Sequence, residues 1–424
     1  MAKTITGKQV GDSYYQVEHP SGLTVLLYPK EHCSTTYAIF GTRYGSIDNC
    51  FQRSDEAGPE SVPEGIAHYL EHKLFESEEG DAFERFSKTG ASANAFTSFE
   101  STCYLFSTTD QVYQSLEILL DFVQSPYFTE ETVRKEQGII GQEIKMYDDD
   151  PQWRVMFNYL KAMYHSHPIR EDIAGTVESI AKITPELLYR CYNTFYNLGN
   201  MVLAIAGNFQ VDKALTVCDK MLKPAAPVTV QRVFPQEPDT IVQPVAEERL
   251  SVASPLFQFG FKEPGADQPR SEKDVAATEV LLETLASDAS PLFRRLLDQG
   301  LVNESSFSYE YFEGNGYATV MFSGESKDPQ AVAQAILEEV ERFQREGIPA
   351  EAFERSKRAL YGELVAALNS TGSIANGLVN MHLKGRELFT YIDSLASLRL
   401  EDGEERLRKV FQRERSVLSV ILPH

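Results

Sequence analysis

Long hydrophobic runs are absent from this 424-residue sequence. No segment approaches the roughly 18 consecutive apolar residues that a membrane-spanning helix requires. The first residues, 1–22, include Lys3 and Lys8 but no apolar run behind them, so they do not resemble a signal peptide. We therefore expect no membrane span and a cytoplasmic location.

Cysteine and basic residues are also scarce. The five cysteines are widely scattered and include no CxxC pair, which argues against a disulfide framework and against a thiolate zinc site. Lysine and arginine total 40 against 62 aspartates and glutamates, giving a net charge of −22. Binding to nucleic-acid phosphates needs a basic surface, so we expect no nucleic-acid partner. A surface this acidic favours neutral or basic ligands, although solubility alone explains it equally well.

The length of the chain and its proline distribution indicate two domains. A chain of 424 residues is too long for one ordinary core and suits two domains or two similar halves. Prolines gather between residues 223 and 245, a window with few periodic apolar residues, which is typical of an interdomain linker. We therefore expect one domain at 1–222, a linker at 223–245 and a second domain at 246–424.

The segments on the two sides of this linker follow a similar order. Before the linker, a helical pattern leads into an apolar strand at Met201–Ala206, and at the end of the chain another leads into Ser416–Leu422. The apolar segment Leu256–Phe261 likewise resembles Thr35–Tyr44. These matches predict a duplication. Because several strands are joined as hairpins and interleaved with helices, we expect an α+β fold of two homologous halves, each a mostly antiparallel sheet packed against helices.

The run HYLEH at 68–72 carries the most chemical information, and apolar residues at helical spacing around it predict a helix. Residues four apart share one face of a helix, so His68 and His72 can reach the same metal ion. Glu71 lies at the edge of that face, where a carboxylate can take a proton from water without being a ligand. Two imidazoles, one carboxylate and water fit an open tetrahedral zinc site best.

A second predicted helix, Thr129–Met146, carries two glutamates seven residues apart. Seven residues make two helical turns, so Glu136 and Glu143 project from the same side. We expect Glu143 to be the third zinc ligand and Glu136 to orient one of the histidines. The alternative for these carboxylates is a partly buried ion pair.

The HxxEH order, followed by the helix with two glutamates, resembles the pitrilysin/insulinase-type zinc metallopeptidases. The resemblance extends to Gly65–Ala67, Ala93–Thr97 and Asn200–Gly207. The resemblance is strong over residues 15–215, and beyond them it concerns only the architecture, that is, the order of the predicted elements. The chain most resembles the half-length bacterial members that occur as paired subunits and are relatives of the mitochondrial processing peptidase.

This resemblance implies a role for each candidate residue. One zinc ion per chain would be held by three ligands: His68, His72 and Glu143. Glu71 would be the general base, and Glu136 would support the site. Asn94 would touch a peptide that adds to the edge of the sheet as an extra strand. The implied activity is a zinc endopeptidase that hydrolyses peptides or unfolded segments inside a chamber.

One departure from the family concerns an Arg and a Tyr that grip the substrate and stabilise the oxyanion in active members. Aligning Pro291–Ser305 with that segment places Leu297 and Asn303 at the two positions. A shifted alignment could draw on three nearby residues: Arg294, Arg295 and Tyr309. The resemblance therefore implies the metal-bearing subunit of a heterodimer whose homologous partner supplies the Arg and Tyr. A homodimer stays open, as does a non-catalytic scaffold or peptide-binding subunit of the same fold.

Overall fold

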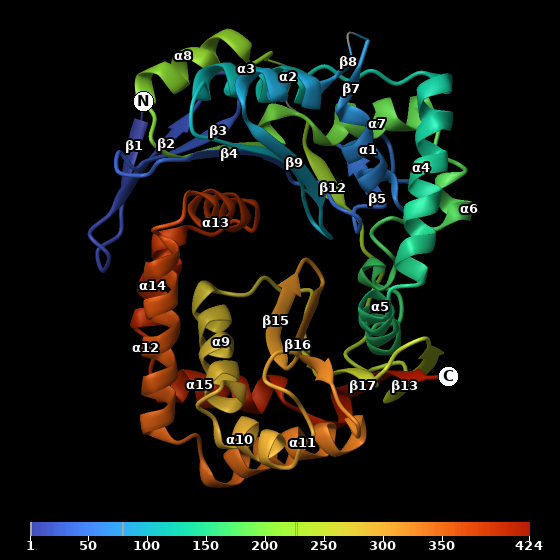
Figure 1. Cartoon of the computed structure of the whole chain (residues 1–424), viewed down its shortest axis with the longest axis vertical. Coiled ribbons are helices and arrows are strands. Elements are labelled where there is room, and N and C mark those ends of the chain that lie inside the picture. Colours follow the sequence, from blue (N-terminus) through green and yellow to red (C-terminus); the bar gives the residue numbers. More distant parts are fainter. Residues whose placement is uncertain (1, 79, 225, 227) are drawn as a thin grey trace. The chain divides into compact units, whose positions relative to one another are not determined.

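The computed structural model describes residues 2–78, 80–224, 226 and 228–424 (Figure 1). The contacts within the chain divide it into two compact units, each assembled from three segments. Unit 1 comprises Met1–Ile144, Asp172–Val233 and Val365–Phe389. Unit 2 comprises Lys145–Glu171, Phe234–Leu364 and Thr390–His424.

Unit 1 is built on a seven-stranded sheet in the order β1-β2-β3-β11-β4-β10-β9. The strands are β1 (Ala2–Thr6), β2 (Ser13–Glu18), β3 (Thr24–Pro29), β4 (Thr36–Thr42), β9 (Ser92–Thr97), β10 (Thr102–Thr108) and β11 (Met201–Gly207). Every residue of β11 is buried. Helix α13 (Thr371–Leu383) packs on β11 and β4 from one face of the sheet, and α3 (Val112–Val123) packs on β4 and β10 from the other (Figure 1). A strand covered on both faces is expected to be apolar throughout, as MVLAIAG is.

Unit 2 repeats this arrangement with five strands in the order β13-β17-β14-β16-β15. They are β13 (Val245–Leu250), β14 (Leu256–Lys262), β15 (Ser308–Gly314), β16 (Tyr317–Glu325) and β17 (Ser416–Pro423). The parallel pair β13/β17 followed by three antiparallel pairings has the pattern of β3/β11 and its neighbours β4, β10 and β9 in unit 1. The prediction of two homologous α+β halves with mostly antiparallel sheets is therefore confirmed.

The helices do not all pack on the sheet that precedes them in the chain. Helix α5 (Pro151–Met163), which comes before the proline-rich segment, packs on β13, β14 and β17 of unit 2. Helix α13, which comes after it, packs on β4 and β11 of unit 1. Each helix therefore buries its apolar face in the unit formed mainly by the other part of the chain. The domain boundaries at 222 and 246 remain a prediction.

The remaining elements complete the two units. The further helices are α1 (Ile66–Leu74), α2 (Ala82–Thr89), α4 (Glu130–Asp148), α6 (Val177–Ile180), α7 (Pro185–Phe195), α8 (Val211–Met221), α9 (Glu272–Ala286), α10 (Pro291–Asp298), α11 (Pro329–Glu346), α12 (Ala350–Ala367), α14 (Leu388–Ala396) and α15 (Leu400–Val410). The short strands are β5 (Cys50–Arg53), β6 (Glu60–Ser61), β7 (Glu76–Ser77), β8 (Gly80–Asp81) and β12 (Val230–Arg232). In the described part of the chain, every helix is too short or too polar to cross a bilayer.

The described residues of the proline-rich segment are held by both units in turn. Strand β12 pairs with β5, and Arg232 forms an ion pair of 2.7 Å with Asp48 in unit 1. Further on, the Glu237 carboxylate accepts hydrogen bonds from three successive backbone N–H groups, those of residues 165–167, and pairs with the buried Lys262 in unit 2. These contacts fix the segment on each side of Val233.

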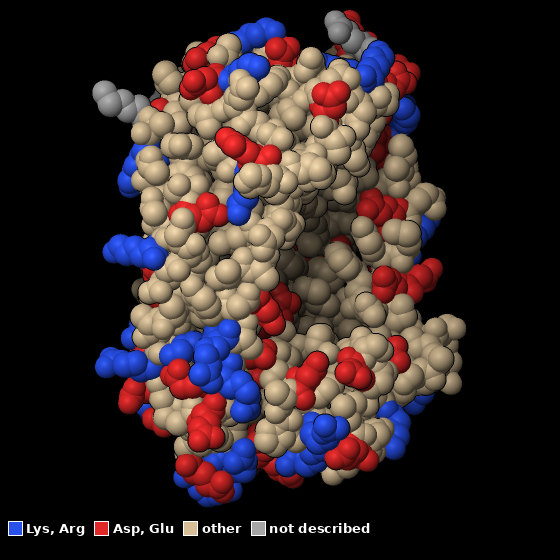
Figure 2. Space-filling view, turned by 60° about the vertical axis from the view of Figure 1, so that its left-hand side comes forward, with Lys and Arg blue, Asp and Glu red and all other residues tan. Residues whose placement is uncertain are grey.

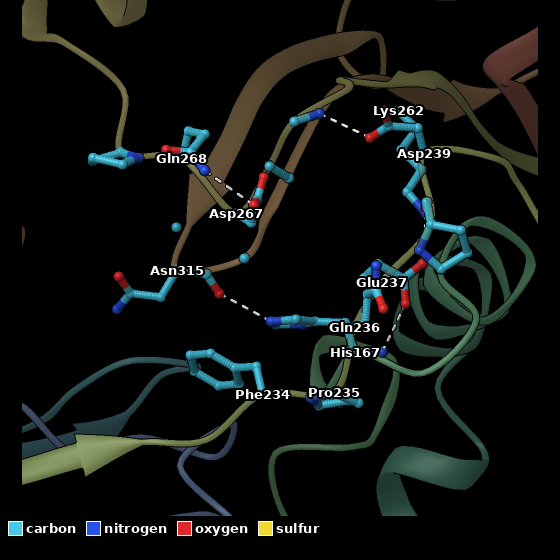
Figure 3. A pocket seen from close by; sticks show the side chains of 16 residues that line it. His167, Phe234, Pro235, Gln236, Glu237, Asp239, Lys262, Asp267, Gln268 and Asn315 are labelled. Atoms are coloured by element: carbon cyan, nitrogen blue, oxygen red, sulfur yellow. Dashed lines mark hydrogen bonds and ion pairs between the residues drawn. The ribbon is translucent and has the colours of Figure 1, made fainter.

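Glu237 also lines a pocket of about 630 Å³ in unit 2 (Figure 3). Among the residues that line this pocket, the His167 ring donates a hydrogen bond from Nε2 to the Asn315 carbonyl, 2.9 Å away. Gly316, with φ of +82°, permits this approach, because a Cβ there would lie 2.7 Å from His167 Nε2. Both ring nitrogens are used, since Nδ1 accepts the Ile169 N–H.

On the face shown in Figure 2 the acidic residues do not form one continuous patch. Figure 2 shows both Asp/Glu and Lys/Arg side chains spread over the visible face of the molecule. Many acidic residues have basic neighbours, as Glu56 has in Arg190. Pairing of this kind lowers the local field that a net charge of −22 would otherwise produce.

Candidate metal centre

Helix α1 carries both histidines, and its start is fixed by a glycine. Gly65 has φ of +85°, and a Cβ at this position would lie 2.3 Å from the Ala174 carbonyl oxygen. Only glycine accepts this conformation and this close approach. The helix places His68 and His72 one turn apart, with ring centroids separated by 4.6 Å. The predicted shared face of the two imidazoles is therefore present.

Helix α4 brings Glu143 to these two rings. Its carboxylate oxygens lie 3.7 Å from His68 Nε2 and 3.4 Å from His72 Nε2, and one donor atom from each residue falls within 4.8 Å of the others. Four donors at about 2.1 Å around a tetrahedral zinc ion lie about 3.4 Å from one another. The observed separations are longer than ordinary hydrogen bonds and match donors that share one ion. The donor set therefore fits zinc.

Glu136, two turns before Glu143 on the same helix, contacts the other nitrogen of His72. Its Oε1 lies 3.0 Å from His72 Nδ1, so the ring donates to the carboxylate and presents Nε2 to the shared position. Tyr69 of α1 donates a hydrogen bond to the Val133 carbonyl of α4, which ties the two helices together. Carboxylate–histidine contacts of this kind orient metal ligands, and this role of Glu136 stays a prediction.

The two histidines differ in charge in the metal-free protein. Burial lowers the pKa of His68 to about 4, so its ring is neutral at pH 7. Burial also acts to lower the pKa of His72, but the hydrogen bond with Glu136 and the nearby carboxylate of Glu143 outweigh it and raise this pKa to about 10. Because a metal ligand must be an unprotonated nitrogen, an ion that binds here has to displace the proton of His72.

Glu71 lies beside the three donors but does not belong to their group among the described residues. Its Oε2 accepts a hydrogen bond of 2.7 Å from the Thr97 hydroxyl. Burial raises the pKa of Glu71, while the hydrogen bond from Thr97 and the charge of His72 oppose that rise. A partly buried carboxylate next to a metal position, and not in it, is suited to accept a proton from water.

Strand β9 forms the edge of the sheet nearest to this site. Among the described strands it pairs only with β10, so its outer backbone groups can pair with another extended chain. Asn94 is exposed on β9, and its Oδ1 accepts the N–H of Ala95. The structure thus places Asn94 on the edge strand and apart from the metal donors, and its contact with a peptide stays a prediction.

Thr97 is the site residue that sequence reasoning missed. The segment Ala93–Thr97 was singled out for its family resemblance, but no pattern marked Thr97 itself. Its role depends on the packing of β9 against α1, a contact between elements 26 residues apart in sequence. Spacing within one helix cannot reveal a partner of this kind.

Of the three residues that could replace the missing Arg and Tyr, Arg295 and Tyr309 are engaged within unit 2, and Arg294 is exposed on α10. The Tyr309 hydroxyl donates a hydrogen bond of 2.5 Å to Glu283, and Arg295 donates to the Ala335 carbonyl. Leu297 lies in the last turns of α10, and Asn303 is exposed on the segment that follows it. The two positions expected to hold the pair therefore carry an apolar side chain and an amide.

Comparison with known proteins supports this picture over the whole chain. The family model "Insulinase (Peptidase family M16)" matches residues 60–177, and "Peptidase M16 inactive domain" matches residues 182–360. The chain is 39% identical to the "Uncharacterized zinc protease YmfH" of Bacillus subtilis over 428 residues, covering 100% of both chains.

Two solved structures illustrate the fold. An M16-like peptidase from Alicyclobacillus acidocaldarius superposes with a TM-score of 0.92 and 36% identity, over 100% of this chain and 98% of that one. Pitrilysin superposes with a TM-score of 0.75 at 15% identity, over 99% of this chain but only 46% of pitrilysin. The chain thus has the fold of about half of pitrilysin.

Proposed function

The chain belongs to the insulinase family of peptidases, M16, and from this premise we propose that it is a cytoplasmic zinc-dependent endopeptidase that hydrolyses peptides or unfolded segments. One observation carries the proposal. His68, His72 and Glu143 place their donor atoms at the separations expected around one tetrahedral zinc ion. Glu71 lies beside them as a carboxylate that is not a ligand.

The roles of the residues follow from this geometry. His68, His72 and Glu143 would hold one zinc ion, which when bound supplies Lewis acidity that polarises the scissile carbonyl and acidifies water. Glu71 accepts the proton of the attacking water and passes it to the amide nitrogen as the C–N bond breaks. The products are a free carboxylate and a free amine. Glu136 keeps the His72 ring in the orientation that directs Nε2 to the ion.

The peptide would bind as an additional strand along the outer edge of β9, where Asn94 lies. Main-chain hydrogen bonds give such a complex its affinity, so binding depends more on an extended backbone than on a particular sequence. This mode suits peptides and unfolded segments, because a folded protein does not offer a free extended strand.

We further propose that the chain works as the metal-bearing subunit of a heterodimer. Leu297 and Asn303 stand where the family's Arg and Tyr are expected, and Tyr309 and Arg295 are already bonded within unit 2. The chain matches only about half of pitrilysin, which leaves the rest of such a molecule to a second, homologous subunit. That partner would supply the Arg and Tyr that stabilise the oxyanion.

The test is cleavage of an unstructured peptide by the purified chain, with and without a homologous subunit that carries the Arg and Tyr. We expect turnover that needs both zinc and the partner. Glu71→Gln should abolish cleavage and keep about one zinc per chain, because the amide cannot accept the proton and Glu71 is no ligand. Loss of metal in that variant would contradict the assignment of Glu71. Robust cleavage by the chain alone, unchanged by any partner, would contradict the heterodimer.

A further inference from the structure

The general base needs a fixed position, and α1 alone does not provide it. Glu71 lies in the second half of a helix of nine residues, and its side chain is only partly buried. A glutamate side chain that is free to rotate would hold its carboxylate toward water in only a fraction of its rotamers. Thr97 restrains the carboxylate: its hydroxyl donates to Oε2 at 2.7 Å, and its backbone also hydrogen-bonds Glu71.

The Glu71 carboxylate can only accept, so Thr97 is the donor, and the next hydroxyl in the sheet does not change this direction. Thr97 is paired with Thr102 of β10, and their hydroxyl oxygens lie 3.4 Å apart. The Thr102 hydroxyl donates its one proton to the Tyr44 carbonyl at 2.9 Å. It therefore has no proton for Thr97, and the Thr97 proton goes to Glu71.

The same threonine belongs to the strand at which a peptide would bind. Side chains alternate along β9, so Ala93, Ala95 and Thr97 point to one face while Asn94 and Phe96 are exposed on the other. Because a peptide added to β9 takes its register from the β9 backbone, its scissile bond lies at a set position relative to Thr97. The hydrogen bond from Thr97 then sets the position of the Glu71 carboxylate relative to that bond.

We infer that Thr97 is a positioning residue that couples the base Glu71 to the substrate-binding edge strand. The inference rests on the proposed function, since it assigns a role within that reaction. Thr97 acts through Glu71 and touches neither the metal donors nor the reacting atoms. Its loss should therefore lower kcat and leave the KM for peptide and the zinc content unchanged.

The test compares Thr97→Val, which removes the hydroxyl at nearly constant volume, with Thr97→Ser, which keeps it. In the presence of the partner subunit we expect Thr97→Val to lower kcat by about 10- to 100-fold with KM within about twofold. Thr97→Ser should restore kcat to within a few fold of the wild type. The matched control is Thr102→Val, which loosens the same pair of strands without touching Glu71 and should leave kcat within about threefold.

An unchanged kcat in Thr97→Val would overturn the inference, and so would a rise in KM at constant kcat. Equal losses of kcat in Thr97→Val and Thr102→Val would also overturn it, because they would show that loosening of β9 is the cause.

A second measurement needs no peptidase activity. In the wild-type background Thr97→Val should lower the melting temperature, because the Glu71 carboxylate loses a donor. In a Glu71→Met background the same change should leave the melting temperature unchanged or raise it, because the hydroxyl then has no carboxylate to bind. A decrease of equal size in both backgrounds contradicts the inference even if the wild type cleaves peptides. If the two backgrounds differ as expected but the wild type cleaves no peptide, only the proposed function is contradicted.

Discussion

Protonation of one buried histidine should destabilise unit 2 in acid, and the resulting loss of unfolding free energy can be worked out from the structure. His167 is 1% exposed; Nε2 donates to the Asn315 carbonyl and Nδ1 accepts the Ile169 N–H. A proton on Nδ1 would face that N–H, so the fold requires the neutral ring. Burial accordingly lowers the pKa of His167 from 6.5 to about 4, although the hydrogen bond to Asn315 and the charge of Glu237 act against this shift.

The sign of the effect follows from the lowered pKa. Below pH 6.5 the unfolded chain binds a proton at this histidine and the folded chain does not, so stability is present above pH 6.5 and is lost as pH falls toward 4. A difference of about 2.5 pKa units, at 1.36 kcal/mol per unit, amounts to a loss of about 3 kcal/mol by pH 4.

Urea unfolding at pH 7 and pH 4 measures this loss, and Trp153, the only tryptophan, reports it from α5 of unit 2. His167→Gln cannot take up a proton, so its unfolding free energy should fall by about 3 kcal/mol less than that of the wild type between the two pH values. His165→Gln, two residues away on an exposed side chain, is the matched control and should behave like the wild type. Equal losses in His167→Gln and the wild type would refute the reasoning.

Two further predictions concern zinc uptake and the core of unit 2. Burial acts to lower the pKa of His72, but its hydrogen bond with Glu136 and the nearby Glu143 carboxylate raise it to about 10 in the metal-free protein, so zinc must displace its proton. Zinc affinity measured by chelator competition should therefore rise about tenfold from pH 7 to pH 8, and equal affinities would show that His72 is not a ligand. In unit 2, Glu263→Gln leaves Arg406, which is 2.6 Å from Glu263 and also buried, without its counter-charge. It should destabilise the protein by about 3–5 kcal/mol in urea unfolding, and a cost below about 1 kcal/mol would contradict this account of the pair.

Spacing within single helices made most of the candidate metal centre predictable. The i, i+4 spacing of His68 and His72 and the two-turn spacing of Glu136 and Glu143 fix which side chains share a face, whatever the rest of the fold does. The structure then shows that the two faces meet. The hydrogen bond from Thr97 lies beyond such reasoning, because it depends on how a strand packs on a helix.

The same limit applies to the fold. Apolar segments predicted the buried strands β4, β11, β14 and β17 and the duplication that relates them, because these are local patterns repeated along the chain. Helices α5 and α13 show what such patterns omit. An apolar face indicates that a helix will be buried, but it does not indicate which of two similar sheets will bury it. Each of these helices packs on the sheet formed mainly by the other part of the chain.

Metal content tests the central claim most directly, because it depends on neither the substrate nor the partner. Elemental mass spectrometry of the purified chain should find about one zinc per chain, and clearly less in Glu143→Gln, since that change removes one of the three donors. No zinc in the wild type, even after supplementation, would contradict the account. His68, His72 and Glu143 would then be a preserved arrangement without a metal, and a non-catalytic subunit of the same fold would become the better description.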